Sequence, residues 1–312
     1  MTSQPQRTAG WMRSPERSNM LMLRIMTWIS LHLGRSASRA VLHLIAAYFL
    51  LFAPASRAGS RGYLRRILPH PVRWADLYRH FFWFATTIHD RVYLLNQRFD
   101  LFDITVHGEA LMQKCVADGR GVFLIGAHMG SFEVIRALGR RHAGLKVAMA
   151  MYEENARKIN DMLAAINPAA QQDVIALGRI DAMLKISEAL DRGALVGMLA
   201  DRTLRDDATL AVPLLGSPAP LPLGPCRMAA ILRRPVIFMT GLYLGKNRYE
   251  IHFEMLADFS QVARTQRQAE IERAVERYAA LLEKYCRRAP YNWFNFFNFW
   301  QFASATGKDP DQ

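Results

Sequence analysis

The sequence predicts an α/β fold, with a mostly parallel central sheet flanked by helices and an N-terminal apolar, basic helical region that associates with a membrane. One reason is that short apolar runs alternate with segments of helical periodicity between residues 103 and 256. Another is that residues 1–73 combine apolar runs with most of the positive charge. A third is that titratable residues directly follow two of the apolar runs, where such sheets build their sites.

The N-terminal 73 residues carry most of the net charge of +13. They contain 11 arginines, no lysine and one acidic residue, Glu16, whereas the remaining 239 residues contain 29 basic and 26 acidic side chains. The apolar runs 19–34 and 40–56 lie among these arginines. A spanning helix needs about 20 apolar residues and normally shows a charge asymmetry. Basic residues on both sides of the second run therefore favour segments that lie in one leaflet against anionic headgroups.

Membrane association has one alternative in this region. A pair of buried amphipathic helices in a soluble protein is the alternative, and whether residues 40–56 span the bilayer stays open. Nucleic acid is not expected as a partner, because the arginines are interleaved with Leu, Ile, Met and Phe. A cleavable signal peptide is not expected either, since residues 1–18 are mixed in character and no clear small-x-small site follows.

Several classes of chemistry are not supported by the sequence. The three cysteines, Cys115, Cys226 and Cys286, are few and widely spaced, which favours a reducing compartment and gives no metal or redox pair. No G-x-S-x-G, G-x-G-x-x-G, G-x-x-x-x-G-K-[ST] or H-E-x-x-H motif is present. Asp206 and Asp207 lie in a polar segment and are expected to be solvated. Neither a metal nor a cofactor is expected.

After residues 1–73, a catalytic domain is expected over 74–302, followed by a polar tail over 303–312. The domain opens with a long aromatic-rich helix over 74–99, and Gly119 closes a later helix. The expected helices lie at 74–99, 109–119, 131–142, 153–165, 180–192, 225–233 and 265–288. The expected strands lie at 103–108, 121–127, 146–152, 173–178, 194–201, 235–244 and 248–256, with a loop over 202–224.

The segment GVFLIGAHMGSFEVIRALG, residues 121–139, passes from an apolar strand directly into a helix. If His128 lies in the connecting loop and the helix begins near Ser131, Glu133 sits in the first turn and can reach the imidazole. A carboxylate on one ring nitrogen fixes the tautomer and favours the charged form, so the other nitrogen can take a proton from a hydroxyl. The alternative is that Glu133 only complements the helix dipole and His128 is a surface residue.

The residues around this junction suit a reactive site. Gly126 and Gly130 permit unusual backbone angles and close approach of a substrate. The backbone N–H groups at the helix start offer a place for developing negative charge. Asp201 and Arg202 end another strand, 194–201, and the carboxyl ends of strands are where this architecture places reactive groups.

These residues resemble the lysophospholipid acyltransferase superfamily, and most closely the branch that contains the late acyltransferases of lipid A biosynthesis. That branch carries His-x4-Asp/Glu after an apolar strand, as in His128 to Glu133. A second block, residues 193–237, is similar in its strand, Asp201, Pro-x-x-Gly loop and following helix. The Pro-x-x-Trp of the branch is matched by Pro290 to Trp293. The likeness covers about residues 20–300.

The chain also departs from that branch. The segment NWFNFFNFW stands where the lipid A enzymes usually have a basic Trp-containing motif, and Asp-Arg stands where Asp-Gln is common. The sequence around GAHMGSFEVIRALG and the aromatic tail are more similar to acyltransferases associated with aryl-polyene-type pigment lipids, a subgroup sometimes labelled glycosyltransferase. These departures leave the implied transfer chemistry in place but do not fix lipid A as the acceptor.

The resemblance implies a role for each candidate residue. His128 would be the general base on the acceptor hydroxyl, and Glu133 would orient and charge it. Asp201 and Arg202 would hold the acceptor or support the site. Arg179 is a further candidate for phosphate or sugar contacts.

Other parts of the chain receive weaker expectations. Ser131, at the helix start, is a candidate substrate-binding residue, and the loop around Gly216 would shape the acceptor pocket, unless its prolines serve only the turn. The aromatic side chains of the tail either line an acyl groove or pack against the core; they are Trp293, Phe294, Phe296, Phe297, Phe299 and Trp300.

The implied reaction is transfer of an acyl chain from the thioester of an acyl carrier protein, or of coenzyme A, to a hydroxyl of a lipid or glycolipid. The implied location is the bacterial inner membrane, with the catalytic domain facing the cytoplasm and an anionic membrane surface as partner. A lipid-linked glycosyltransferase is the first alternative, although it would often show an Asp-x-Asp motif that the chain lacks. A non-catalytic membrane scaffold is the second.

Overall fold

The central sheet in this computed structural model confirms the predicted mostly parallel α/β architecture. The structure describes residues 20–141, 147–152, 166, 173–178, 181–203 and 207–302. Within these residues a seven-stranded sheet has the order β1-β9-β8-β2-β5-β3-β4. Only the β8–β9 pair is antiparallel. The strands are β1 (Asp103–His107), β2 (Val122–Gly126), β3 (Val147–Tyr152), β4 (Asp173–Leu177), β5 (Leu195–Leu199), β8 (Pro235–Tyr243) and β9 (Arg248–Asp258).

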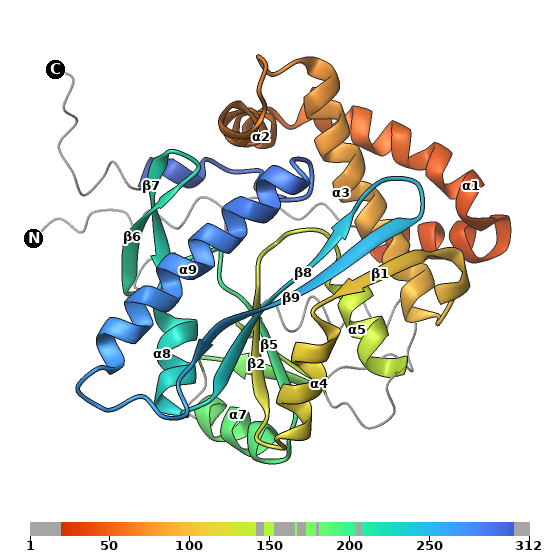
Figure 1. The fold of residues 1–312 in the computed structure, drawn as a ribbon. Coiled ribbons are helices and arrows are strands. Elements are labelled where there is room, and N and C mark those ends of the chain that lie inside the picture. The colour runs from red at the N-terminus through yellow and green to blue at the C-terminus, as the bar shows by residue number, and fades with distance from the viewer. Residues whose placement is uncertain are drawn as a thin grey trace, which may run out of the picture.

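Helices flank this sheet, and α9 runs alongside β8 and β9 (Figure 1). The predicted helices are present wherever the structure describes the chain; the one expected over 153–165 lies outside the described residues. The helices are α3 (Trp74–Leu95), α4 (Glu109–Ala117), α5 (Phe132–Arg141), α7 (Ala182–Asp191), α8 (Gly224–Ile231) and α9 (Arg267–Arg288), with short 3₁₀ turns η1 (Phe99–Leu101) and η3 (Phe299–Phe302).

The core lies on both faces of the sheet. Every residue of β2 and of β8 is buried, as expected for strands that are covered by helices on both sides. One apolar cluster includes Phe123 and Val196, and a second includes Val122 and Leu195. Neighbours in sequence thus point to opposite faces, which is the two-residue period of a strand. This packing fixes the ends of β2 and β5, where the candidate site lies.

The predicted loop over 202–224 is wrong in part, because residues 209–222 form an antiparallel hairpin of β6 (Thr209–Leu214) and β7 (Ser217–Pro222). Its turn residues Leu215 and Gly216 have φ of 50° and 79°, as a type I′ turn requires. Proline cannot donate to a ladder, so it is disfavoured in central strands. In a two-stranded ribbon both strands are edges, where proline is tolerated.

The N-terminal region is helical, as predicted, and gathers beside one end of the sheet (Figure 1). Helix α1 (Met20–Phe52) is interrupted at Gly34, whose φ of 80° and ψ of 172° are non-helical. A further helix, α2 (Pro54–Ile67), follows where no element had been predicted. Arg35 and Arg39 of α1 each donate to the carbonyl of Lys246, in the β8–β9 turn, at 2.6 and 2.7 Å.

One stretch of α1, Gly34–Phe52, is long and apolar enough to cross a membrane by length and composition alone, and 22% of it is buried inside the protein.

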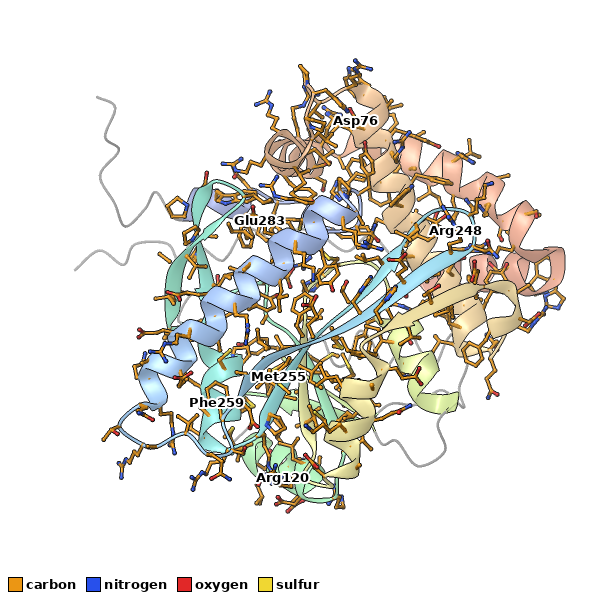
Figure 2. All side chains as sticks on the ribbon, viewed as in Figure 1. Asp76, Arg120, Arg248, Met255, Phe259 and Glu283 are labelled. Atoms are coloured by element: carbon orange, nitrogen blue, oxygen red, sulfur yellow. The ribbon has the colours of Figure 1, made fainter. Side chains whose placement is uncertain are left out.

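Figure 2 places Arg120, just before β2, and Asp76, in the first turn of α3, at opposite ends of the molecule. Strand β2 therefore runs toward the N-terminal helices, and its carboxyl end, which leads to His128, faces them.

Candidate active site

His128 and Asp201 come together because they occupy matching places on adjacent parallel strands. β2 pairs with β5 in the register that sets Gly126 opposite Leu199, and each site residue lies two positions further along. The register continues past the strands, since Ala200 donates its backbone N–H to the carbonyl of Gly126 at 3.0 Å. The Nδ1 atom of His128 lies 2.8 Å from Oδ1 of Asp201. The backbone N–H of His128 also donates to Oδ2 of Asp201 at 3.1 Å.

This contact determines which ring nitrogen of His128 is basic. A carboxylate can only accept, so the proton lies on Nδ1 and the neutral ring keeps a lone pair on Nε2. Within the described part of the chain, no residue is hydrogen-bonded to Nε2. The His128 side chain is 34% exposed, whereas that of Asp201 is 3% exposed. The ring is thus held from its buried side and can meet a substrate through Nε2.

The surroundings keep Asp201 ionised and His128 neutral. Burial alone would raise the pKa of Asp201, but the charge and hydrogen bond of His128, the nearby Arg202 and the Trp293 N–H together lower that pKa well below its ordinary value. Burial lowers the pKa of His128 below 6.5; Arg202 adds to this and Asp201 opposes it. The resting ring is consequently a free base at neutral pH, next to a carboxylate that stabilises it once it is protonated.

Trp293 gives Asp201 a third hydrogen bond. The indole N–H donates to Oδ2 of Asp201 at 2.9 Å, and the Trp293 side chain is fully buried. Oδ2 thus accepts from both Trp293 and the His128 backbone, which leaves Oδ1 directed at the imidazole. A carboxylate fixed by several donors holds one orientation as well as one charge.

The hydrogen bond that the sequence assigned to Glu133 and His128 is instead made by Asp201. Glu133 lies in the first turn of α5, as predicted, and is buried. Its Oε2 accepts from Arg136 at 3.0 Å, and its Oε1 lies 3.7 Å from Nε of Arg91. Buried carboxylates require such partners, because an unpaired charge in the interior is costly.

Two of the amides expected to hold negative charge are already used. Gly130 donates its N–H to the carbonyl of Asn292 at 2.9 Å, and Ser131, just before α5, donates to the carbonyl of Gly241 at 2.8 Å. Gly130 has φ of 62°, and a Cβ there would collide with the Gly241 carbonyl. These groups tie the His128 loop to β8 and to the C-terminal segment; the Ser131 side chain is buried.

The remaining predicted site residues take different positions. Arg202 stacks over the ring of Phe297 at 5.5 Å and donates to the Phe294 carbonyl at 3.5 Å, so it supports the C-terminal segment. Gly216 lies in the β6–β7 turn, and a Cβ there would meet nothing within 4 Å. The positive φ of the turn therefore explains why glycine stands at this position, rather than a close contact with a neighbour. Arg179 lies outside the described residues.

The aromatic tail packs against the core, which was one of its two predicted placements. Trp293, Phe294, Phe299 and Trp300 are buried. Phe296 and Phe297 are partly buried and pack against the same apolar cluster. Sequence reasoning missed the hydrogen bond from the Trp293 indole to Asp201. The Pro-x-x-Trp match singled out Trp293 but gave no partner for its N–H.

One group in the described residues has the composition of a metal site. The ligand atoms of His107, Glu250 and His252 lie within 4.8 Å of one another. Arg288 donates to Oε2 of Glu250, with its Nε at 3.0 Å, and the same oxygen lies 3.1 Å from Nε2 of His252. The carboxylate already has a cation, and the two imidazole rings are stacked in parallel. The group therefore fits an ion-pair network better than a metal.

Comparison with known proteins identifies the family of the chain. The model of a family described as bacterial lipid A biosynthesis acyltransferase matches residues 12–301. A comparison with curated proteins gave no match. The matched range includes His128, Asp201 and Trp293, together with the whole sheet. This match confirms the resemblance and the enzyme class expected from the sequence, while the likeness to the aryl-polyene subgroup stays a prediction. The chain belongs to the bacterial lipid A biosynthesis acyltransferase family.

Proposed function

We propose that this acyltransferase moves an acyl chain from a thioester of acyl carrier protein, or less favourably of coenzyme A, to a hydroxyl of a lipid or glycolipid. The family match establishes an acyltransferase that acts on lipid. The observation that carries the finer proposal is the 2.8 Å contact between His128 Nδ1 and Asp201 Oδ1, which leaves Nε2 as the base.

In the proposed reaction, Nε2 of His128 takes the proton of the acceptor hydroxyl as its oxygen attacks the thioester carbonyl carbon. The C=O pair moves onto oxygen, and its return expels the thiolate and completes the ester. The imidazolium then gives its proton to the thiolate, so ester and free thiol leave and the enzyme is unchanged. No acyl-enzyme forms, because the nucleophile is the acceptor's own oxygen.

Asp201 and Glu133 have separate roles in this proposal. Asp201 orients the imidazole and stabilises its charge while the proton is held. Glu133, in the first turn of α5, pairs with Arg136 of the same helix and lies near Arg91 of α3, so it links the two helices beside the His128 loop. The buried Glu133–Arg136 pair fixes the first turn of the helix. Arg202 keeps the C-terminal segment in place and the His128 pKa low.

The same proposal places the protein on the bacterial inner membrane, with the catalytic domain toward the cytoplasm. Large apolar side chains are exposed on α1, among them Leu44, Tyr48, Leu51 and Phe52. Arg57 of α2 lies 5.5 Å from the ring of the exposed Trp74. Apolar surface next to arginine and tryptophan suits an interface with anionic headgroups. Protease protection of the C-terminal domain in inverted inner-membrane vesicles would contradict the orientation.

The test is acyl transfer in washed membranes that contain the native protein, His128→Ala, Asp201→Asn or Glu133→Gln at equal protein level. Labelled acyl carrier protein thioesters and acyl-CoA are supplied in parallel, and labelled lipids are identified by mass spectrometry. Loss of one labelled lipid in His128→Ala supports the proposal and names donor and acceptor. Unchanged labelling in His128→Ala would overturn it.

A further inference from the structure

Residues 292–294 form a short strap that touches the His128 loop on one side and the N-terminal helices on the other. The Asn292 carbonyl accepts from the N–H of Gly130, and the N–H of Phe294 donates to the carbonyl of His128 at 2.8 Å. Between them, the Trp293 indole donates to Asp201. The strap therefore contacts both the backbone of the base and the carboxylate that orients it.

On its other side the strap is held by His80, from the N-terminal half of α3. Nε2 of His80 lies 2.9 Å from the Trp293 carbonyl, and Nδ1 lies 2.8 Å from Oγ of Ser60 in α2. Since a carbonyl only accepts, Nε2 carries the proton and Nδ1 accepts from the Ser60 hydroxyl. His80 and Ser60 are both fully buried, so each bond forms in the interior, where its loss is costly.

Helix α2 also packs directly against the C-terminal segment. A Cβ at Gly59 would collide with the backbone nitrogen of Phe297, so the helix and the segment are in close contact. Tyr63, one turn further, meets the ring of Trp293 edge-on, with centroids 5.1 Å apart. The chain of contacts runs from α2 through His80 and Trp293 to Asp201 and then His128.

We propose that His80 is a positioning residue, which uses its bond to the Trp293 carbonyl to hold the indole on Asp201 and so aim His128 at the acceptor. The inference rests on the proposed function, because it assumes that the imidazole of His128 is the base. It also makes α2 and α3 part of the support of the site. The N-terminal region, which contains α2, would then position the catalytic residues as well as bind the membrane.

Two amide variants separate the bonds of His80. In His80→Gln the side-chain nitrogen can occupy the place of Nε2 and still donate to Trp293. In His80→Asn the side-chain oxygen can occupy the place of Nδ1 and accept from Ser60, but the bond to Trp293 is lost. Both variants are neutral amides, so a difference between them reports the Trp293 bond. Trp293→Phe, which keeps an aromatic ring and removes the N–H, is the second test of the same link.

The assay uses the full chain in detergent, with fatty acyl thioesters of acyl carrier protein and a lipid A precursor in mixed micelles. We expect His80→Asn to lower kcat by about tenfold or more with KM within about twofold, because a misaimed base loses transition-state contacts. His80→Gln should stay within about threefold of the native kcat. Asp201 becomes more basic when the indole N–H is removed, as in Trp293→Phe, or is no longer held on it, as in His80→Asn. A more basic Asp201 raises the pKa of His128, so the acid limb of kcat/KM should move to higher pH in these two variants and not in His80→Gln.

The outcomes separate the two hypotheses. Loss of transfer in His128→Ala, together with the Asn–Gln difference and the moved acid limb, supports the positioning role. Equal loss in both amide variants with an unmoved acid limb would show a purely structural role for His80 and overturn the inference, while the proposed function stands. Native activity in His128→Ala would overturn the proposed function and the positioning role with it.

Discussion

At the scale of single residues, Asp201 is buried and accepts three hydrogen bonds, from the backbone N–H and the ring Nδ1–H of His128 and from the indole N–H of Trp293. Asp201→Asn keeps the shape but removes the charge. Its amide N–H groups then face either Nδ1 of His128 or the two N–H donors that Oδ2 accepts from, so the imidazole is no longer held in one tautomer. We expect kcat to fall by about three orders of magnitude or more, as when a charged orienting group of a catalytic histidine is lost. Steady-state kinetics on purified protein measure this.

Glu133→Gln is the matched comparison for that variant. Its expected loss of kcat is smaller than that of Asp201→Asn, because Glu133 pairs with Arg136 and Arg91 rather than with the imidazole. The main effect should be on stability, by about 3 kcal/mol, since a buried guanidinium loses its counter-charge. A larger kinetic loss in Glu133→Gln than in Asp201→Asn would contradict this division of roles.

The pH dependence of transfer follows from the lowered pKa of His128. The base is free above its pKa, which burial and Arg202 hold below 6.5. As pH falls, kcat/KM should therefore be retained through 6.5 and lost only at lower pH. Because Asp201 raises this pKa, the residual activity of Asp201→Asn should show an acid limb at still lower pH. An acid limb above 6.5 in the native enzyme would contradict the assignment.

His80 makes the stability of the protein depend on pH. Burial lowers its pKa to about 4, from 6.5 in the unfolded chain, although the Trp293 carbonyl opposes the change. Between pH 6.5 and 4 the unfolded chain binds a proton that the folded ring does not, so the free energy of unfolding falls as pH drops, by about 3 kcal/mol at most. His80→Gln lacks this contribution, so urea unfolding at pH 7 and at pH 5 should show a smaller pH difference than in the native protein.

At the scale of elements, two glycines of α2 form a matched pair. A Cβ at Gly59 would collide with the Phe297 backbone, whereas at Gly62 it would meet nothing within 4 Å. Gly62→Ala should stabilise the protein by up to about 1 kcal/mol, through the better helix propensity of alanine. Gly59→Ala should lower Tm and transfer activity together, since the helix and the C-terminal segment must separate. Equal Tm values for the two variants would contradict the close contact.

The hairpin and α2 show where local pattern and observed element differ. Residues 209–222 fall within the loop predicted over 202–224, yet they pair as a two-stranded ribbon whose edges tolerate proline. Residues 54–67 have two glycines and four arginines, which weaken a helical pattern, but proline at the first helical turn and packing of Tyr63, Leu64 and Ile67 into the core produce a helix. In both cases tertiary contacts outweighed propensity.

At the scale of the whole molecule, the exposed apolar residues of α1 predict where the protein meets a bilayer. Replacing Leu51 and Phe52 with glutamate should weaken sedimentation with anionic vesicles by about tenfold or more, since burying one such side chain contributes about 1.5–3 kcal/mol. Leu184→Glu, at an exposed leucine of α7, is the control and should leave binding unchanged. Equal loss in the control would show that the effect is general rather than confined to α1.

The sequence by itself determined the alternation of strands and helices, the position of His128 after an apolar strand and the basic, apolar character of the N-terminal region, because these follow from local periodicity and composition. The partner of His128 could not be read in the same way. Glu133 is the nearest carboxylate in the chain, but Asp201, 73 residues away, makes the bond. That choice depends on β5 lying next to β2 in register, and strand order is set by long-range packing. Trp293 and His80 reached the site for the same reason: only the folded chain brings α3, the strap and two strand ends together.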